Sequence, residues 1–245
     1  MSKGVRYMVL ATILFSVVQV LVKYLDNYPF FELIFFRSIV SLVISVIVIK
    51  KGKISLLGNN KLFLILRGLF GTVSLCCFFY SIKHAPIGTV VTIVNIKPFL
   101  ILIVAFFVLG EKFKLIQILF FFISFIGIVI INNFDNSIGV LPLVTTILAA
   151  FFASIAHTIV RKLRSSDQPI VIIFYFTMIA GPVVLPFTLL YGKMPESLAD
   201  WTLLVCIGLM THFAQLYLTK AYQSSEVSKI SYWYYLGIVF SIIFG

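Results

Sequence analysis

Long, uninterrupted apolar runs are the feature that most limits how this chain can fold. The runs are close to 20 residues long, and the short polar stretches between them hold almost all of the charged residues. A helix of about 20 residues crosses a hydrocarbon core of roughly 30 Å and satisfies its own backbone polar groups. The chain is 61% hydrophobic and 11% charged, whereas soluble domains average about 45–50% apolar and about 25% charged residues. We therefore predict an all-α polytopic membrane protein.

Nine membrane-spanning helices are predicted from these runs. Their ranges are 5–24, 30–49, 62–82, 87–109, 115–131, 140–160, 169–191, 201–219 and 230–245. The first run is too long for the core of a signal peptide, and no small-residue cleavage site follows it, so we expect it to remain as a helix of the mature protein. The three cysteines lie inside spans and act as small apolar residues.

The basic residues are distributed unequally between the two sides of the predicted membrane. The chain has a net charge of +11, and thirteen Lys and Arg fall on the side that carries the N-terminus. The other side receives only Lys23, Lys83 and Lys193. Because cytoplasmic segments are enriched in Lys and Arg, we predict a cytoplasmic N-terminus in the cell (inner) membrane. The basic charge thus reflects topology within a lipid bilayer, and we expect no nucleic-acid partner.

An internal repeat divides the chain into residues 1–135 and 136–245. At an offset of 140, Phe36 meets Phe176 and Gly68 meets Gly208, while Gln19 meets His157 at an offset of 138. The first four predicted spans map in order onto the last four, and the fifth closes the first unit. A unit of five helices reverses the direction of the second copy, so an inverted 5+5 repeat is expected. On this mapping a tenth helix is missing from the chain.

Three segments resemble the EamA-type, ten-helix members of the drug/metabolite transporter superfamily. They are "PFFELIFFRSIV", "RGLFGTVSLCCFFYSIKHAPIGTVVTIVNIKPFLILIVAFFVLGEKF" and "KAYQSSEVSKISYWYYLGIVFSIIFG". The resemblance implies ten helices, cytoplasmic termini and transport of small metabolites such as amino acids, nucleobases or S-adenosylmethionine. The second repeat lacks the Gly-Glu pair that closes the first, which is the departure from the family pattern.

Lys97 is the sharpest candidate for a substrate-binding residue. It lies near the middle of the predicted span 87–109, next to Pro98 and close to Asn95. An ionised lysine at this depth costs about 2.5–3.5 kcal/mol on insertion scales, so it requires a partner. An anionic group of the substrate, such as a carboxylate, is one such partner. The alternative is a lysine that pairs with backbone carbonyls, one of which Pro98 leaves without a donor, or that snorkels to the interface.

Other polar residues within spans are further candidates. His212 and Gln215 are three residues apart and therefore lie on the same side of a helix. We expect both side chains to contact the substrate opposite Lys97. The alternative for this pair is an interhelical hydrogen bond within the bundle. The substrate-binding candidates also include Gln19, His157, Tyr234 and Tyr80. For Tyr234 the alternative is an aromatic belt at the interface.

Two arginines, two glycines and Pro98 are assigned to structure. Arg37 and Arg67 lie within predicted spans and are expected to pair within the bundle, while Gly68 and Gly71 permit close helix approach. No metal site is predicted, because the three histidines lie on different segments without ligand spacing.

The sequence favours a secondary transporter over other membrane functions. It contains no G-x-S-x-G elbow and no carboxylate at a span centre, which argues against an intramembrane enzyme. It also lacks the G-x-x-x-x-G-K-[ST] loop that an ATP-driven pump requires. We predict alternating-access transport of small polar metabolites with no cofactor, driven by proton coupling or exchange. A non-transporting scaffold is the remaining alternative.

Overall fold

The structure is a bundle of long helices. This computed structural model describes residues 2–110, 138–226 and 230–237, together with residues 116, 119, 122, 123, 126 and 240. All elements in these ranges are helical. They are α1 (Lys3–Tyr24), α2 (Phe30–Lys51), α3 (Lys61–His84), α4 (Ile87–Val94), α5 (Lys97–Leu109), α7 (Val140–Lys162), η1 (Leu163–Ser165), α8 (Pro169–Tyr191), α9 (Leu198–Ser224) and η2 (Ser231–Tyr235).

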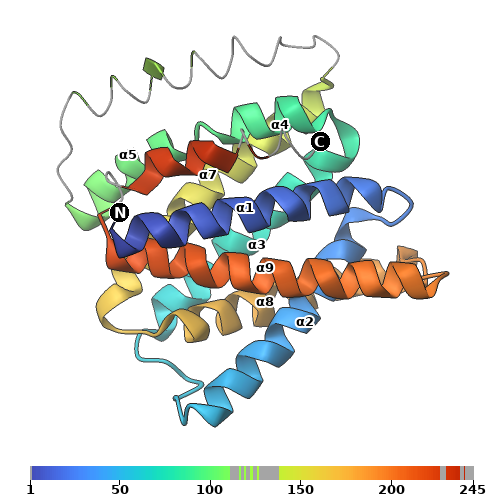
Figure 1. Ribbon diagram of the computed structural model, residues 1–245, viewed down its shortest axis with the longest axis horizontal. Coiled ribbons are helices and arrows are strands. Elements are labelled where there is room, and N and C mark those ends of the chain that lie inside the picture. Colours follow the sequence, from blue (N-terminus) through green and yellow to red (C-terminus); the bar gives the residue numbers. More distant parts are fainter. Residues whose placement is uncertain are drawn as a thin grey trace.

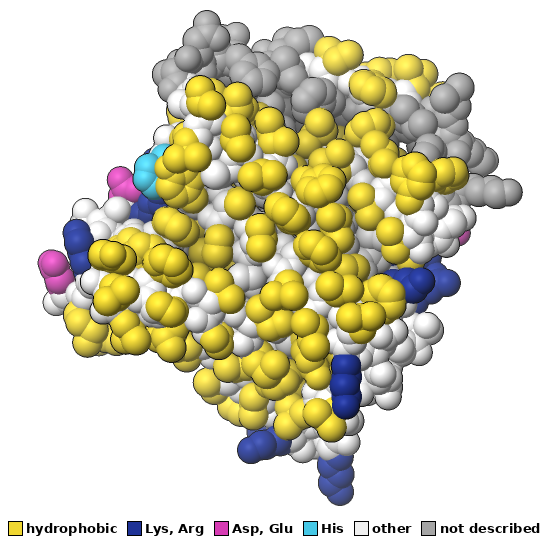
Figure 2. All heavy atoms as spheres, turned by 180° about the vertical axis from the view of Figure 1, so that it is seen from behind, with side chains coloured by type: hydrophobic (Ala, Val, Ile, Leu, Met, Phe, Trp, Pro, Cys, Tyr) yellow, Lys and Arg dark blue, Asp and Glu magenta, His cyan; other side chains and the backbone are white. Residues whose placement is uncertain are grey.

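Seven segments of the described chain are long and apolar enough to cross a membrane. They correspond to seven of the nine predicted spans. The predicted span 115–131 lies almost wholly outside the described residues, and 230–245 is described only over 230–237 and at 240. Figure 2 shows one face of the molecule covered largely by apolar side chains, with Lys and Arg at its margins. Such a face suits contact with lipid tails rather than with water.

Two predicted spans differ in detail from the observed helices. The predicted span 87–109 consists of two helices, α4 and α5, which are separated at Asn95 and Ile96. The predicted span 201–219 is longer at both ends, as α9. Its start is fixed by a capping box, in which the Ser197 hydroxyl accepts a hydrogen bond from the Asp200 amide (3.1 Å) and the Asp200 carboxylate accepts one from the Ser197 amide (3.1 Å). Hydropathy alone does not register such a cap.

The helices pack in pairs that bring the two halves of the chain together. In Figure 1, α1 runs beside α9, and α2 crosses the bundle obliquely. On the other side of the bundle α7 packs along α3, while α2 contacts α8 as well as α9. Small residues allow these close approaches. A Cβ on Gly68 would lie 2.3 Å from the Ile179 side chain in α8, and one on Gly208 would lie 2.5 Å from Val40 in α2.

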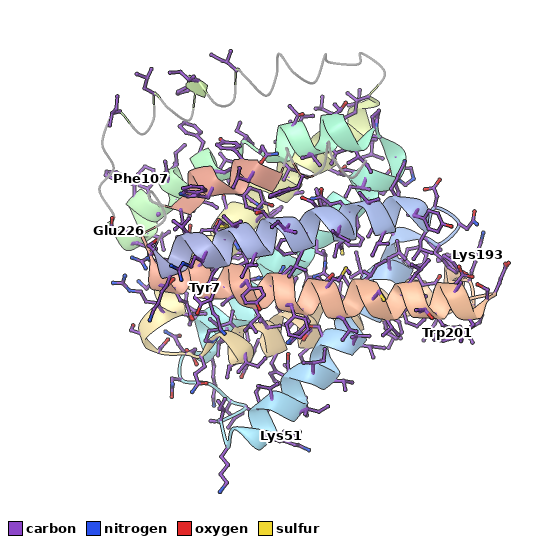
Figure 3. All side chains as sticks on the ribbon, in the orientation of Figure 1. Tyr7, Lys51, Phe107, Lys193, Trp201 and Glu226 are labelled. Carbon is purple, nitrogen blue, oxygen red and sulfur yellow. The ribbon has the colours of Figure 1, made fainter. Side chains whose placement is uncertain are left out.

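The helix ends are tied together by loop contacts at both ends of the bundle. At one end, Asp167 accepts hydrogen bonds from the backbone amides of Asn59 (2.6 Å) and Asn60 (3.2 Å). At the other end, Glu32 accepts one from the Lys193 amide (2.8 Å), and the Tyr28 hydroxyl accepts one from the Glu196 amide (3.3 Å). Figure 3 shows the same separation of ends: Lys193 and Trp201 lie opposite Glu226 and Phe107. Short polar connections thus remain outside the apolar layer.

Candidate functional site

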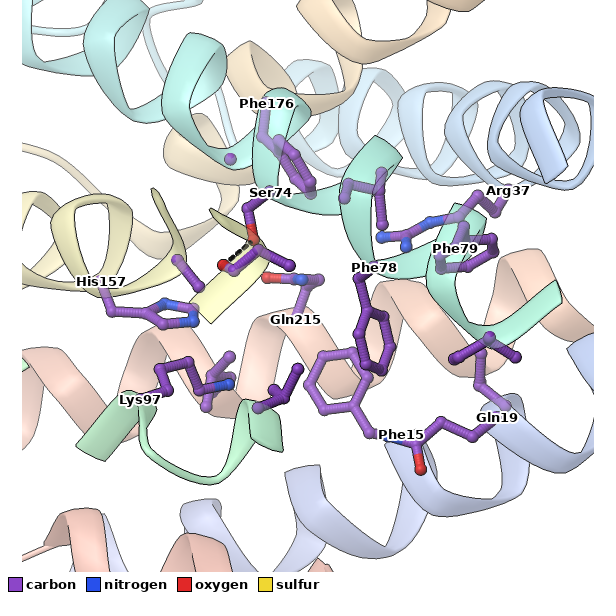
Figure 4. A pocket seen from close by; sticks show the side chains of 18 of the residues that line it. Phe15, Gln19, Arg37, Ser74, Phe78, Phe79, Lys97, His157, Phe176 and Gln215 are labelled. Atoms are coloured by element: carbon purple, nitrogen blue, oxygen red, sulfur yellow. Dashed lines mark hydrogen bonds between the residues drawn. The ribbon is translucent and has the colours of Figure 1, made fainter. Parts of the chain in front are cut away.

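A cavity of about 110 Å³ lies inside the bundle, between the two halves of the chain. Its lining comes from α1, α2, α3, α4, α5, α7, α8, α9 and η2. The polar lining residues are Gln19, Arg37, Arg67, Ser74, Lys97, His157 and Gln215. Figure 4 shows Lys97 and His157 together on one side of the cavity, Gln215 near its centre, and Arg37 and Gln19 on the other side. The described lining contains no Asp or Glu.

The break between α4 and α5 carries Lys97 into this cavity. Because Pro98 has no amide hydrogen, the carbonyl of Val94 lacks its usual helical donor. The chain makes a tight turn there instead, in which the Ile96 amide bonds to the Ile93 carbonyl (3.1 Å). Pro98 then occupies the first turn of α5, the helical position in which a proline is tolerated. Lys97 consequently begins a new helix at mid-bundle depth.

Lys97 is buried, with 5% of its surface exposed, and its ammonium lies over an aromatic ring. The Lys97 Nζ is 3.7 Å from the centroid of the Tyr234 ring in η2, a geometry that gives a favourable cation–π interaction. Within the described ranges the only ion pair is Lys83–Asp26. Lys97 therefore has a π-face as a neighbour, and no described carboxylate neutralises its charge.

Arg67 is also buried in the cavity wall and uses only part of its hydrogen-bonding capacity. Its Nη2 donates to Gln215 Oε1 (3.4 Å), and its guanidinium lies 4.5 Å from the centroid of the Phe176 ring. Its Nε and Nη1 have no partner among the described residues. Gly71 makes room for this arrangement, because a Cβ there would fall 2.1 Å from Arg67 Nη1.

Arg37 contacts the same phenylalanine from α2. Its guanidinium lies 5.6 Å from the Phe79 ring centroid and 5.9 Å from that of Phe176. It forms no ion pair with any described acidic residue. The sequence predicts a structural role for Arg37 and Arg67, as residues that pair within the bundle, and the structure places both in the cavity wall. The signal that points to such a place is general: an ionisable residue within a membrane span usually faces a functional cavity.

Asn95 lies beside a second, smaller cavity that adjoins the first. Phe15, Gln19 and Tyr234 line both cavities, so the two are neighbours. Asn95 Nδ2 donates to the Val91 carbonyl (2.5 Å), while Oδ1 is buried without a partner in the described part of the chain. The turn between α4 and α5 thus leaves a buried amide oxygen without a described partner next to the smaller cavity.

The remaining candidates divide between the cavity and the helix contacts around it. His157 lines the cavity and stacks on Tyr222, with 5.0 Å between ring centroids. His212 is not among the lining residues; it contacts α2 instead, where its Nδ1 is hydrogen-bonded to the Ser41 hydroxyl (2.8 Å). Tyr80 also lies elsewhere and stacks on His84 with 4.1 Å between ring centroids. Of the two residues expected to face Lys97 from the second half, Gln215 alone lines the cavity.

Comparison with known proteins places this chain among transporters. The pseudopaline exporter of Pseudomonas aeruginosa is 28% identical over 247 residues, which cover 100% of this chain and 87% of the exporter. The S-adenosylmethionine uptake transporter of Rickettsia prowazekii is 26% identical over 242 residues (98% of this chain, 82% of the transporter). Solute carrier family 35 member G1 of Mus musculus is 25% identical over 258 residues (98% and 70%).

A structural match and a family match are consistent with these relatives. A solved structure, described only as a crystal structure of a protein, matches 99% of this chain and 87% of its own with a TM-score of 0.83 at 16% identity, which shows a shared fold. The relatives are named for transport rather than for a reaction, so the chain is a transporter and not an enzyme, as predicted. The model of the EamA-like transporter family matches residues 2–133 and 140–245. The chain therefore belongs to the EamA-like transporter family.

Proposed function

We propose that this chain is a secondary transporter that moves small polar metabolites bearing a carboxylate across the cytoplasmic membrane by alternating access. The observation that carries the proposal is the uncompensated charge of Lys97 at the α4–α5 break. A buried cation without an acidic partner is costly, and a substrate carboxylate would reduce that cost on binding. Discontinuous helices near the bilayer midplane form the substrate sites of many secondary transporters.

The arrangement of helices supports two inverted repeats as the moving parts. Under the expected repeat, α1, α2 and α3 correspond to α7, α8 and α9. The contact between α1 and α9 then corresponds to the contact between α7 and α3. In the same way, the contact between α2 and α9 corresponds to the contact between α8 and α3. The close approaches at Gly68 and Gly208 are equivalent in the same way. The cavity lies between the proposed copies, where rocking of one against the other would open it to either side.

The relatives support the substrate class but leave the direction of transport open to experiment. Their names include an exporter of pseudopaline and an uptake transporter of S-adenosylmethionine, which supports a small-molecule cargo for this chain. The energy source would be proton coupling, for which the cavity offers the imidazole of His157, or exchange of one substrate molecule for another. Uptake into proteoliposomes with and without a pH gradient separates these two mechanisms.

The role of Lys97 is tested by Lys97→Met in proteoliposomes. Cargo is first found by thermal stabilisation of the wild-type protein across metabolite classes, because a ligand stabilises the state that it binds. We expect Lys97→Met to lower the uptake of a carboxylate cargo by about tenfold or more, the loss of about 1.4 kcal/mol of binding energy. The exposed Lys51 supplies the matched control, Lys51→Met. Wild-type rates in correctly folded Lys97→Met would refute the proposed site.

A further inference from the structure

Three fixed positive charges surround one cavity. Arg37, Arg67 and Lys97 are each at most 5% exposed, and all three line the same space. No Asp or Glu among the described residues lines it, and none pairs with these cations. The wall is otherwise apolar or neutral apart from His157. One bound carboxylate would balance one of the three charges and leave two buried cations uncompensated, which is energetically unfavourable.

The two arginines form a pair around Phe176. Their guanidinium carbons lie 5.9 Å and 4.5 Å from the centroid of its ring, so the two groups are no farther apart than the sum of these distances. Two Arg67 nitrogens, Nε and Nη1, have no described partner, and Arg37 forms no ion pair with a described acidic residue. Guanidinium groups present N–H donors in a planar fork that matches carboxylate and phosphate oxygens. Two such groups beside one ring are therefore candidates for holding an anionic group.

Lys97 offers a second anion-binding position in the same cavity. In Figure 4 it projects from the side occupied by His157, whereas Arg37 enters beside Phe79 from the opposite side. The aromatic residues Phe15 and Phe78 lie between them along the wall. An extended compound would therefore meet positive charge at both of its ends and apolar surface at its middle.

We propose that the cargo carries two separated anionic groups, either carboxylate or phosphate, one bound by Arg37 and Arg67 and the other by Lys97. This inference rests on the proposed transport function and narrows its substrate class from one anionic group to two. The phenyl rings of Phe15 and Phe78 contact the apolar segment that joins the two groups. Selectivity for dianions follows, because a monoanion satisfies one position and leaves the other cation unpaired.

The first experiment measures thermal stabilisation of the detergent-solubilised wild-type protein by matched acids. Glutarate and valerate are five-carbon acids that differ by one carboxylate, and 3-phosphoglycerate replaces a carboxylate by a phosphate. All are added as sodium salts at equal ionic strength, because exposed charges are screened by salt. We expect glutarate or 3-phosphoglycerate to raise the melting temperature at concentrations at which valerate has no effect. Equal stabilisation by valerate, or none by either dianion, would overturn the proposal.

The second experiment assigns the two positions. Arg37→Gln should weaken glutarate binding by about tenfold while changing valerate binding little, so that the preference for the dianion is lost. Arg37→Lys keeps the positive charge but loses the planar array of guanidinium donors. We expect this variant to prefer glutarate over valerate less than wild type does but more than Arg37→Gln does. The matched control is Arg164→Gln, because Arg164 is exposed within η1. If Arg37→Gln retains the wild-type preference, the arginine position is wrong. If it does not fold, the wild-type series and Arg37→Lys decide the question.

Transport assays distinguish failure of this inference from failure of the proposed function. Proteoliposomes that take up valerate as fast as glutarate would keep the transporter function and refute the dianion requirement. Binding that favours glutarate, without uptake of any bound acid, would keep the two-anion site and refute transport of this class of compound. Uptake of glutarate or 3-phosphoglycerate over valerate, lost in Arg37→Gln but not in Arg164→Gln, supports both.

Discussion

The position of the Arg67 guanidinium depends on a residue that has no side chain. Gly71 lies one turn after Arg67 in α3, on the same helical face. A Cβ at residue 71 would lie 2.1 Å from Arg67 Nη1 and 3.0 Å from the Phe176 ring. The nearest atom is the far end of a flexible side chain, so the arginine would move rather than the helix. The glycine thus sets the geometry of the proposed anion site more than the packing of the bundle.

Gly71→Ala should therefore impair function more than stability. We expect a melting temperature within about 3 °C of wild type, which corresponds to about 1 kcal/mol or less, and glutarate affinity lowered by about tenfold. Gly181→Ala is the control, since a Cβ there would meet nothing closer than the Ser38 side chain at 3.8 Å. Thermal melting and glutarate titration of both variants provide the measurement. Unchanged affinity in Gly71→Ala would show that the Arg67 position does not matter.

The sequence predicts a binding role for Lys97 but not for the two arginines that line the same cavity, and the difference is physical. Lys97 stands next to Pro98, a local signal that marks irregular backbone. Whether Arg37 and Arg67 pair within the bundle or face a cavity depends on Phe176, which is more than 100 residues away in the chain. No local pattern reports that contact. His212 was assigned to the substrate on its helical face alone, and its contact with Ser41 also requires the tertiary structure.

At the scale of elements, the positions of helices follow from local hydropathy, and their interruptions do not. Seven predicted spans correspond to helical segments of the structure. Whether a segment can span the bilayer depends on the hydropathy of about 20 consecutive residues, which the sequence gives directly. The proline next to Lys97 indicated a freed carbonyl, but not that α5 begins at Lys97 itself. The 3₁₀ geometry of η2, which brings Tyr234 to the Lys97 ammonium, likewise has no signature in hydropathy.

Pro98→Ala tests whether the break between α4 and α5 is functional. The alanine restores an amide that can donate to the Val94 carbonyl, so we expect stability to be unchanged or raised by about 0.5–1.5 kcal/mol. A continuous helix would draw Lys97 away from Tyr234, and the initial rate of uptake should fall by about tenfold. Pro182→Ala is the control, because Pro182 is exposed and α8 continues through it. Full uptake by Pro98→Ala would mean that the break is dispensable.

At the scale of the whole molecule, charge divides the two ends of the bundle. The end that holds the N-terminus of α1 also carries the exposed Lys50, Lys51, Lys61 and Lys162. At the opposite end, Lys83 forms an ion pair with Asp26 (3.4 Å). Lys193 lies at the same end, and its backbone amide donates a hydrogen bond to Glu32. From this asymmetry we predict that the basic end faces the cytoplasm. The fold fixes which residues share an end, and the charges predict which side each end faces.

Single cysteines at the two ends test this orientation. In a background in which Cys76, Cys77 and Cys206 are replaced by alanine, we introduce Lys193→Cys or Lys51→Cys; both side chains are exposed. A membrane-impermeant maleimide applied to spheroplasts should label Lys193→Cys, because its end faces outward under the positive-inside rule. It should label Lys51→Cys only after the membrane is permeabilised. A permeant maleimide that labels both variants establishes that each thiol is reactive. Labelling of Lys51→Cys in intact spheroplasts, with Lys193→Cys protected, would reverse the predicted orientation.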